Sequence, residues 1–386
     1  MRIFVLGAGA AGAYLAGLLE RQGHTVWCGD RDPERARRSL PASIPCRGVN
    51  ARNLWGIVRA ARSCHLLVNA APAAFNHTVL RAALRLRVHY LDLATHLGSY
   101  PFKAEQLRFH KKFLAKRRLA LINAGAAPGL TNLLVARAAD ELDRVEQVQI
   151  RLFEHTESED PVSTWSAETA FDEATSRPRL YRQGRFRLAR RFSEPEWFHF
   201  PPPIGRVRAV LAAQDEAGTL PYFIPMRELD VKIGGNEIDR LRRWYRQGRL
   251  RASHRPPQAR FPRTPTPQQV ARLIRRGLLT NARFALAVVV RGEKNGELLE
   301  RRWYATFPTL YQIRLRGLPT TPIAYATAHT AALFIKHFPR EHWGVHPPEA
   351  LPAEARRAVQ RGLKARGISI VSKTRALQKP EDDEEL

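Results

Sequence analysis

The stretch "RIFVLGAGAAGAYLAGLL", residues 2–19, decides the fold, because it joins an apolar strand to an Ala-rich helix through a glycine turn. Its glycines stand in G-x-G-x-x-G spacing. The first glycine of this spacing permits a tight turn, the second lets the backbone approach a diphosphate, and the third lets the helix pack on the strand. The helix N-terminus adds a positive dipole end. The residues predicted to cradle a dinucleotide are Gly7, Gly9, Ala10, Ala11 and Gly12.

An acid closes the second predicted strand. Asp30 follows "HTVWCG" and stands about 20 residues past the third glycine, where an acid can hold the ribose hydroxyls of NAD. Arg31 follows it and can instead bind the 2′-phosphate of NADP. Asp32 is better placed than Asp30 to cap the next helix. We therefore expect NAD or NADP as the cofactor, with Asp30 favouring NAD.

The first third of the chain alternates short apolar runs with amphipathic stretches, and this βαβα rhythm predicts a parallel sheet covered on both faces. The predicted strands are 2–6, 24–29, 64–69, 88–93 and 119–123. The predicted helices between them are 11–21, 33–39, 54–61, 76–86 and 100–116.

The rhythm changes after residue 150. Longer strands are predicted at 147–155, 229–233, 282–291 and 298–306, and Asn295-Gly296 between the last two is a hairpin signal. This pattern predicts an α+β second domain with a mixed, mostly antiparallel sheet. Helical periodicity returns in 321–338, "GVHPPEAL" is turn-rich, and residues 379–386 form a predicted disordered acidic tail.

The carboxyl ends of the predicted parallel strands carry polar and small residues. Ligands of open parallel sheets bind beyond these ends. The "NAAP" segment places Asn69, Ala70 and Pro72 there as predicted cofactor contacts. Asp92 stands at the end of the next predicted strand, and His96 follows it. Asp92 is a candidate for a substrate-amine anchor or a proton relay, with helix capping as an equal alternative, and His96 is a candidate acid–base group.

The last predicted strand ends in "INAGAAPG", residues 122–129. This glycine turn lacks the G-x-G-x-x-G spacing, so we do not read it as a second phosphate cradle. Gly125 and Pro128 are predicted to form a floor beside the nicotinamide, and Asn123 is predicted to contact the substrate. Thr131 or Asn132 can cap the helix that leads into the second domain.

Bulk composition restricts the function classes. A chain of 386 residues exceeds the usual size of one compact core, which predicts two domains. The net charge of +27 suggests an anionic partner or an Arg-rich bias spread over solvated faces, and we favour the bias. Three scattered cysteines argue against disulfides and against a metal site. No membrane span and no signal peptide are apparent, so cytoplasm is the expected compartment.

Six stretches together resemble the saccharopine dehydrogenase-like oxidoreductases, a group that includes carboxynorspermidine dehydrogenases. They occur in family order and span most of the chain. The matching stretches are "RIFVLGAGAAG", "LLVNAAPAAFNHTVLRAALRLRVHYLDLA", "GAAPGLTNLLVARAADEL", "STWSAETAFDEATSRPRLYRQGRF", "DVKIGG" and "GVHPPE".

The resemblance implies a Rossmann domain completed by C-terminal elements, with a substrate domain inserted after the last strand. We assign residues 1–125 and 320–365 to the Rossmann domain and 126–319 to the substrate and dimerisation domain. The resemblance also implies a nicotinamide cofactor, redox chemistry at the C–N bond of an amino-acid-derived imine or secondary amine, and a homodimer. A polyamine-pathway enzyme and a non-catalytic nucleotide-binding regulator stay open as alternatives.

An acidic segment interrupts this basic chain. Residues 152–176 hold seven acids and neither Lys nor Arg. One interpretation is a recognition surface for a substrate ammonium. We favour charge compensation by the arginines of 177–191, since exposed acids are usually solvated. The exceptions, predicted to contact the substrate at the start of a helix, are Trp165, Ser166 and Glu168.

Two further features are basic. Lys232 in "DVKIGG" is flanked by apolar residues, so it can donate a proton or bind a carboxylate, and an edge-strand lysine with a structural role is the alternative. Residues 239–255 interleave Arg with Trp244 and Tyr245. Helical spacing with Leu241 and Trp244 as buried anchors explains this segment better than a nucleic-acid groove. We expect a small-molecule substrate and no specific nucleic-acid partner.

Overall fold

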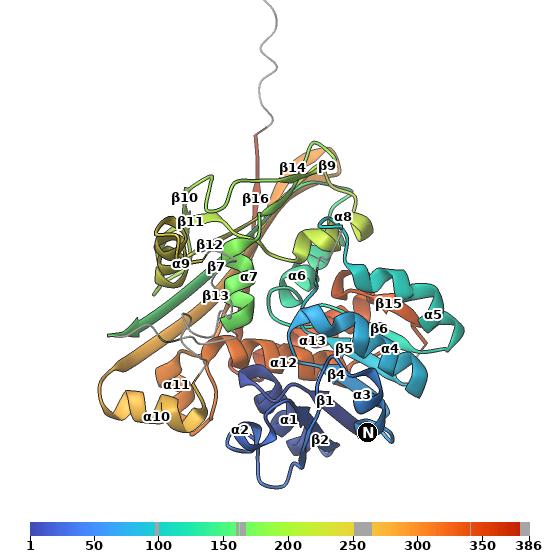
Figure 1. Cartoon of the computed structure of the whole chain (residues 1–386). Helices are drawn as coiled ribbons and strands as arrows, with labels where there is room; N and C mark the ends of the chain where they lie inside the picture. The colour runs from blue at the N-terminus through green and yellow to red at the C-terminus, as the bar shows by residue number, and fades with distance from the viewer. Residues whose placement is uncertain (97–99, 160–161, 163–166, 251–264, 340, 379–386) are drawn as a thin grey trace, which may run out of the picture.

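The computed structural model describes residues 1–386 except 97–99, 160–161, 163–166, 251–264, 340 and 379–386 (Figure 1). Within the described residues, the chain forms a seven-stranded sheet and a nine-stranded sheet. The first is wholly parallel and the second is mostly antiparallel, which confirms the predicted fold class. The predicted acidic tail lies outside the described residues.

The parallel sheet has the strand order β15-β6-β5-β4-β1-β2-β3. Because all its pairings are parallel, the carboxyl ends of its strands meet at one edge. The order reverses between β1 and β4, which is where doubly wound sheets bind dinucleotides. The strands are β1 (Arg2–Leu6), β2 (Thr25–Asp30), β3 (Cys46–Gly48), β4 (Leu66–Asn69), β5 (His89–Asp92), β6 (Leu119–Leu121) and β15 (Gly344–His346).

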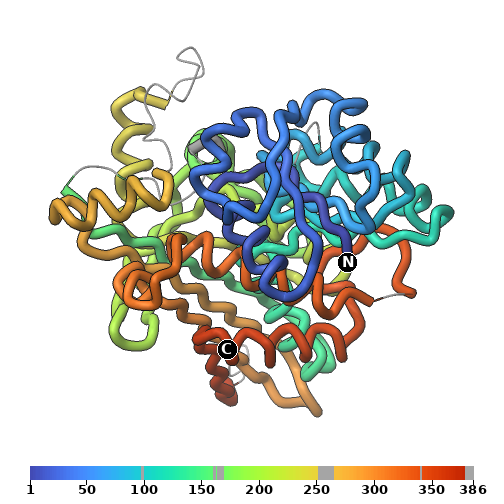
Figure 2. The backbone as a smooth tube through the Cα atoms, turned by 90° about the horizontal axis from the view of Figure 1, so that it is seen from below, coloured from blue at the N-terminus to red at the C-terminus, as the bar shows by residue number. Residues whose placement is uncertain are grey.

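Helices cover both faces of this sheet. Phe4, Leu67 and Tyr90 point to the face that packs on α3, α4 and α5, while Ile3 and Val68 point to the face with α1 and α12. In Figure 2 the orange-red C-terminal segments lie beside the blue N-terminal lobe, and α12 contacts α1. The helices are α1 (Ala10–Arg21), α2 (Pro33–Arg37), α3 (Leu54–Ala60), α4 (Asn76–Leu86), α5 (His110–Ala115), α12 (Pro322–Lys336) and α13 (Ala353–Lys364).

The second sheet follows the order β10-β11-β12-β7-β13-β14-β16, and β8 joins β12 to β9. The β12–β7 pair is parallel and the other pairs are antiparallel. Its strands are β7 (Arg144–Ser158), β8 (Arg179–Arg182), β9 (Arg185–Leu188), β10 (Glu196–His199), β11 (Arg206–Leu211), β12 (Glu228–Gly234), β13 (Leu279–Lys294), β14 (Glu297–Thr306) and β16 (Ser369–Ala376).

One face of the second sheet packs toward the first domain. Val148, Ile150 and Leu152 of β7 share a core cluster with residues of α6 and α12, whereas Phe153 points to the opposite face and packs on Phe200. The helices of this part are α6 (Leu130–Ala139), α7 (Ala167–Thr175), α8 (Leu220–Phe223), α9 (Asn236–Arg246), α10 (Pro267–Arg275) and α11 (Leu310–Leu315).

The elements with strong periodicity form where the sequence predicts them. β1 and α4 have the predicted bounds, and the predicted hairpin joins β13 to β14 with positive φ at Asn295 and Gly296. The helix predicted over 100–116 is instead a 3₁₀ helix (Glu105–Phe109) followed by α5, because the Ala104 N–H donates to the Gly218 carbonyl of the second domain.

The C-terminal segment crosses between the two sheets. β15 pairs with β6 in the parallel sheet, and β16 pairs with β14 in the second sheet. Strands β3, β8, β9, β10, β11, β15 and β16 were not predicted.

Other expectations concern membranes and nucleic acids. Within the described part of the chain, no helix has the length and hydropathy to cross a bilayer. Leu241 is buried in α9 and Trp244 packs on the core, while Arg242, Arg243 and Arg246 lie on other positions of the helix. The helical interpretation of this segment is confirmed up to Arg246, where α9 ends.

Candidate active site

The glycine turn after β1 has the shape of a phosphate cradle. Gly7 has a φ of +94°, and a Cβ there would collide with the backbone of Ala70 and Ala71. A Cβ on Gly12 would collide with the Gly7 carbonyl oxygen, so the helix can pack this closely only on a glycine. A Cβ on Gly9, in contrast, would meet nothing within 4 Å. The backbone at Gly9 therefore faces open space, and the turn fits a dinucleotide diphosphate.

Asp30 is held against this turn. Its Oδ2 accepts the Ala8 N–H at 2.8 Å and its Oδ1 accepts the Asp32 N–H at 2.9 Å. A carboxylate has lone pairs left for a ribose hydroxyl after these two bonds. Arg31 beside it is exposed. Asp32 caps α2 by accepting the Arg35 N–H at 3.0 Å, as the sequence predicts.

The segment after β4 lies next to the turn. The Ala70 N–H donates to the Leu6 carbonyl at 2.8 Å, and Ala70 and Ala71 fill the space in front of Gly7. Asn69 is buried, accepts the Ala71 N–H at 3.2 Å and donates to Asn76 Oδ1 at 2.7 Å. The small residues of "NAAP" thus let the chain pass beside the cradle.

Asp92 closes β5 but points into the protein. It is 1% exposed, and burial raises its pKa to about 7. Its Oδ1 accepts the Asn123 N–H at 2.7 Å, and its Oδ2 accepts the Tyr90 hydroxyl at 3.0 Å and the Gln106 amide at 3.3 Å. This carboxyl group therefore fixes the start of the turn after β6.

Asn123 carries an unsatisfied donor at the carboxyl edge. The side chain is fully buried and its φ is 59°. Its Oδ1 accepts the Thr95 hydroxyl at 2.6 Å, whereas its enclosed Nδ2 has no hydrogen-bond partner among the described residues. An unpaired buried donor costs about 1–3 kcal/mol. Among the described residues, Asn123 Nδ2 therefore lacks the hydrogen-bond acceptor that a buried amide needs.

His96 follows the same edge and is half-exposed. Its Nδ1 lies 3.5 Å from Glu105 Oε1, and this carboxylate raises the pKa of the imidazole. Asp172 and Asp215 of the second domain act in the same direction. The neighbouring carboxylates therefore favour the protonated form of the His96 imidazole.

Asn132 stabilises the turn from Gly125 to Gly129. Gly129 has a φ of +132°, and a Cβ there would collide with the Gly125 backbone. Asn132 Oδ1 accepts the Gly129 N–H at 3.0 Å, and its Nδ2 donates to Thr219 Oγ1 at 3.2 Å and to Glu349 Oε1 at 3.1 Å. Asn132 thus caps α6, as predicted, and also ties three distant segments together.

Two buried carboxyl groups flank this network. Thr131 donates to Glu216 Oε1 at 2.9 Å, and burial raises the pKa values of Glu216 and Glu349 to about 7 each. The Oε2 atoms of both are enclosed and have no hydrogen-bond partner within the described residues. The two carboxyl groups also repel each other, which favours a proton on one of them.

Glu349→Gln is expected to become stabilising relative to wild type as the pH rises. A raised folded-state pKa means that wild type loses stability as the pH climbs from about 4.5 to 7, whereas the glutamine variant does not, a difference of up to about 3 kcal/mol. Unfolding midpoints of both proteins at acidic and mildly alkaline pH test this. The exposed Glu354→Gln is the control, and a pH-independent difference for Glu349→Gln would contradict the raised pKa.

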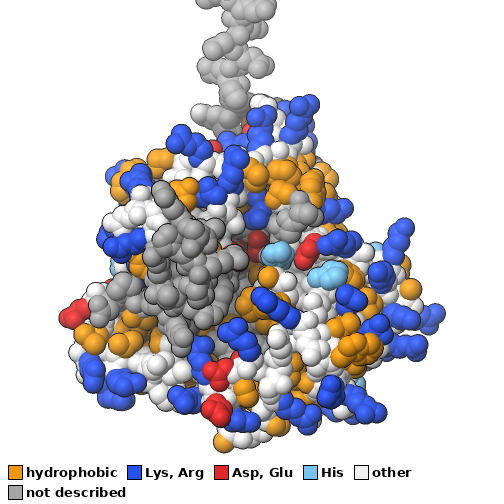
Figure 3. Space-filling view, viewed as in Figure 1, with side chains coloured by type: hydrophobic (Ala, Val, Ile, Leu, Met, Phe, Trp, Pro, Cys, Tyr) orange, Lys and Arg blue, Asp and Glu red, His pale blue; other side chains and the backbone are white. Residues whose placement is uncertain are grey.

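A loop of the second domain, residues 212–219, closes over the carboxyl edge. Besides the Thr131–Glu216 bond, Asp215 interacts with the Thr95 N–H and lies 3.8 Å from Arg179. Arg179 also donates to the Pro101 carbonyl at 2.8 Å. In Figure 3, acidic and histidine side chains gather at a hollow in the middle of a face on which Lys and Arg are otherwise spread. The 212–219 loop therefore contacts residues that follow β5 and β6 of the parallel sheet.

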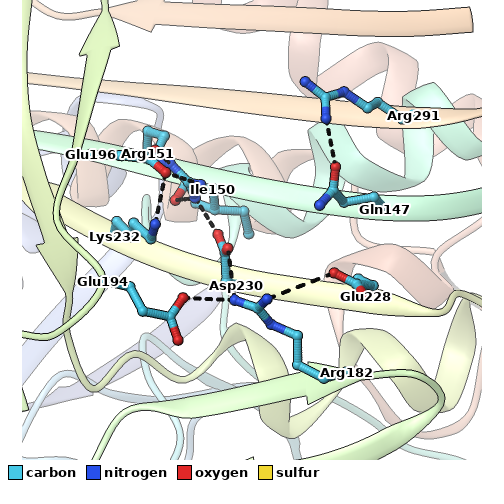
Figure 4. Close-up of polar contacts among 10 residues, drawn as sticks. All are labelled: Gln147, Ile150, Arg151, Arg182, Glu194, Glu196, Glu228, Asp230, Lys232 and Arg291. Atoms are coloured by element: carbon cyan, nitrogen blue, oxygen red, sulfur yellow. Dashed lines mark hydrogen bonds and ion pairs between the residues drawn. The ribbon is translucent and has the colours of Figure 1, made fainter. Parts of the chain in front are cut away.

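Lys232 is not brought together with Asp92 and His96. Its neighbours Val231 and Ile233 pack toward the first domain, so Lys232 points to the opposite face of the second sheet. There its Nζ lies 2.7 Å from Glu196 Oε2, and Glu196 also pairs with the fully buried Arg151 (Figure 4). Arg151 pairs in turn with Asp230. The lysine belongs to a charge network between strands. The alternative of an edge-strand lysine is wrong, because β12 lies between β11 and β7 and Lys232 is buried.

The remaining predicted substrate contacts cannot be placed. Trp165 and Ser166 lie outside the described residues, and Glu168 falls in the first turn of α7 without a described side chain. Three residues that the sequence analysis did not single out form hydrogen bonds at the carboxyl ends of the parallel strands. Gln106, Glu216 and Glu349 come from three separate segments and form hydrogen bonds with Asp92, Thr131 and Asn132, respectively. In the sequence, only the "GVHPPE" match pointed to Glu349.

Comparisons with known proteins agree with this architecture. Residues 3–125 match the family model described as the saccharopine dehydrogenase NADP-binding domain. Carboxynorspermidine synthase from Vibrio cholerae is 24% identical over 204 residues, which cover 50% of this chain and 49% of that protein. The enzyme of the same name from Vibrio alginolyticus is 23% identical over 204 residues, with the same two coverages of 50% and 49%. The chain thus spans about half the length of the curated relatives it matches.

Among solved structures, apo saccharopine dehydrogenase (L-Glu forming) from Saccharomyces cerevisiae superposes with a TM-score of 0.69 at 11% identity. The match covers 97% of this chain and 100% of that one. The resemblance inferred from the sequence is thereby confirmed. The protein has the fold of saccharopine dehydrogenase, and its residues 3–125 match the NADP-binding domain of that family.

Proposed function

We propose that this protein is an NAD(P)-dependent oxidoreductase that transfers a hydride to or from the C–N carbon of an amino-acid-derived imine or secondary amine. The observation that carries the proposal is the meeting, at one sheet edge, of an open glycine cradle, the unpaired Asn123 amide, His96 and a loop of the second domain. A hydride transfer needs alignment, exclusion of water and a proton relay rather than a protein nucleophile.

The cofactor contacts in this proposal run along the carboxyl edge. Gly7 to Gly12 hold the diphosphate, Asp30 or Arg31 meets the adenosine ribose, and Asn69 to Pro72 pass beside the cofactor. Gly125 and Pro128 form the floor at the nicotinamide end. When bound, the nicotinamide ring supplies or accepts the hydride.

The chain's own residues supply the proton and the orientation. His96 is proposed to donate a proton to the substrate nitrogen during reduction and to accept it during oxidation, because Glu105 favours its charged form. Asp92 acts through Asn123 as a positioning residue rather than at the substrate. Lys232 has no part in the reaction.

The Arg31→Ala variant tests whether the protein binds NADPH through the 2′-phosphate. If Arg31 binds a 2′-phosphate, its loss is expected to weaken NADPH binding about tenfold or more and to leave NADH binding unchanged, since a hydrogen bond to a charged group is worth about 1.5–3 kcal/mol. Nucleotide fluorescence titrations measure both constants. Arg62→Ala, at an exposed site, is the control. Equal losses for the two nucleotides would exclude a role at the 2′-phosphate.

The overall reaction is tested by a fluorescence titration with NADH and NADPH, followed by a turnover screen against imines formed from 2-oxo acids or aldehydes with amino acids and diamines. Saturable nucleotide binding with nucleotide oxidation on one imine class is expected. Absence of nucleotide binding would contradict the proposal. Binding without turnover on every imine would favour a nucleotide-binding regulator.

The compartment and assembly belong to the same proposal. A cytoplasmic compartment is proposed because the chain has only three cysteines, an odd and sparse set that does not suggest a disulfide framework. A homodimer is proposed on the resemblance, and sedimentation velocity at two concentrations tests it.

A further inference from the structure

The segment 101–104, which follows β5, contacts the second domain at each of its residues, and the contacts at its two ends are hydrogen bonds. Arg179 Nε of β8 donates to the Pro101 carbonyl at 2.8 Å. The Ala104 N–H donates to the Gly218 carbonyl at 2.9 Å, and Ala104 is only 1% exposed. The second domain therefore anchors this segment of the first domain at both ends.

Aromatic rings make the contacts in the middle of the segment. Phe102 stacks on Phe186 of β9, with the ring centroids 5.3 Å apart and an interplanar angle of 23°. Phe186 also stacks on Tyr222 of α8 at 5.4 Å, and the Lys103 ammonium lies 4.9 Å from the centroid of the Tyr222 ring. In Figure 1, β9 and α8 lie together at the top of the view. Because stacked rings attract one another beyond the effect of buried area, Phe186 joins the segment to the second domain.

The β8–β9 hairpin fixes the position of the Phe186 ring. Tyr181 and Phe186 are register partners on the two strands, and their rings meet edge to face with centroids 4.8 Å apart. The turn residues Gln183 and Gly184 both have positive φ, as a type I′ turn requires. Tyr181 also pairs with Leu229 of β12. Phe186 therefore stands on an element that is tied to the second sheet.

The two residues that follow the segment contact the candidate active site. Glu105 Oε1 lies 3.5 Å from His96 Nδ1. Gln106 is fully buried, and its amide donates to Asp92 Oδ2 at 3.3 Å. Because both residues follow Ala104 directly in the chain, a displacement of the segment would displace both of these side chains.

We propose that Phe186 is a positioning residue for the candidate active site, because its ring holds the segment 101–104 in place and the segment holds Glu105 against His96. The role in the reaction rests on the proposed oxidoreductase function, whereas the placement of His96 is a property of the free protein. A phenylalanine that only fills a core is the alternative. Phe186 is partly exposed, however, and its ring contacts come from three separate segments.

The test is an NMR titration of the His96 imidazole in the free full-length protein, compared between wild type and Phe186→Ala. The His96 signal is identified by its absence from His96→Gln. Glu105 raises the pKa of His96, and Asp172 and Asp215 of the second domain act in the same direction. Without the Phe186 ring, we expect Glu105 to move away from the imidazole, so the pKa of His96 should fall toward its ordinary value.

Two further measurements accompany the titration. Amide hydrogen exchange at Ala104 should become about tenfold faster or more in Phe186→Ala, because its bond to Gly218 opens more often. On the imine found in the screen, kcat should fall about tenfold or more while the nucleotide affinity stays unchanged. A misplaced proton donor slows the reaction without altering the phosphate cradle.

Three variants serve as controls. Phe186→Tyr keeps the ring and should retain the wild-type titration of His96. Trp197→Ala removes an aromatic side chain that is exposed on β10 of the same domain and contacts Arg206, so it should leave the pKa of His96 unchanged. Phe102→Ala removes the facing ring and should act like Phe186→Ala. Combining these two substitutions should add little, because both remove one contact.

An unchanged pKa of His96 in both Phe186→Ala and Phe102→Ala would overturn the positioning role. An equal fall of this pKa in Trp197→Ala would overturn it as well, because the effect would then reflect a general loss of stability. The titration needs neither nucleotide nor substrate. Failure of the oxidoreductase proposal and failure of the positioning role are therefore distinguishable.

Discussion

Gly9→Val is expected to abolish nucleotide binding while leaving the fold intact. Gly9 has φ −76° and ψ −163°, which a valine adopts without strain, and the space in front of its Cα is empty of protein atoms. The valine side chain would occupy the volume through which the diphosphate approaches the backbone. We expect the affinity for NADH and NADPH to fall at least about 100-fold, or roughly 2.7 kcal/mol. Fluorescence titration and the unfolding midpoint of the free protein measure the two effects.

Gly17→Ala is the matched control for this experiment. It adds a methyl group to the same helix two turns further on, where the nearest atoms belong to the side chains of Pro41 and Arg21. This variant should keep its nucleotide affinity. If Gly9→Val binds nucleotide as wild type does, the glycine turn is not the phosphate cradle.

Asn132→Ala is expected to lower stability by about 4 kcal/mol and the unfolding midpoint by roughly 6 °C or more. The alanine would leave the Gly129 N–H, the Glu349 carboxyl and the Thr219 hydroxyl without this buried partner. Each unsatisfied buried group costs about 1–3 kcal/mol. The loss should also loosen the Gly125–Gly129 turn, so we expect turnover on any imine substrate to fall more than nucleotide affinity.

Asn53→Ala is the control for that substitution. Asn53 caps α3 from an exposed position by accepting the Gly56 N–H at 2.9 Å, and loss of such a cap costs about 1 kcal/mol. Denaturant unfolding of the two variants should therefore differ clearly. Equal losses would mean that Asn132 acts only as a helix cap.

The parallel sheet and its glycine turn could be predicted from the sequence because the signals that encode them are local. The glycine spacing, the acid closing β2 and the alternation of strands with helices each lie within a short window of residues. β15 was missed because three residues, one of them a buried valine, follow no periodicity, and its place is set by pairing with β6 across more than 200 residues. β16 and the strands β8 to β11 depend on second-domain neighbours in the same way.

The location of the candidate site could be predicted from the sequence, but the side-chain contacts within it could not. The sheet rule placed Asn69, Asp92 and Asn123 at one edge, and the structure has them there. That Asp92 points inward and that Lys232 points away depends on side-chain direction. Contacts such as Thr131 with Glu216 bridge segments whose approach no local pattern encodes.

The central claim is that hydride transfer to a C–N carbon occurs in the crevice between the two domains. Its most direct test is turnover of the imine found in the screen with NADPH or NADH deuterated at nicotinamide C4, followed by mass spectrometry of the product. We predict that one stereoisomer of the labelled nucleotide delivers its deuterium to the carbon of the new C–N bond. Nucleotide oxidation without deuterium in that product would contradict the claim.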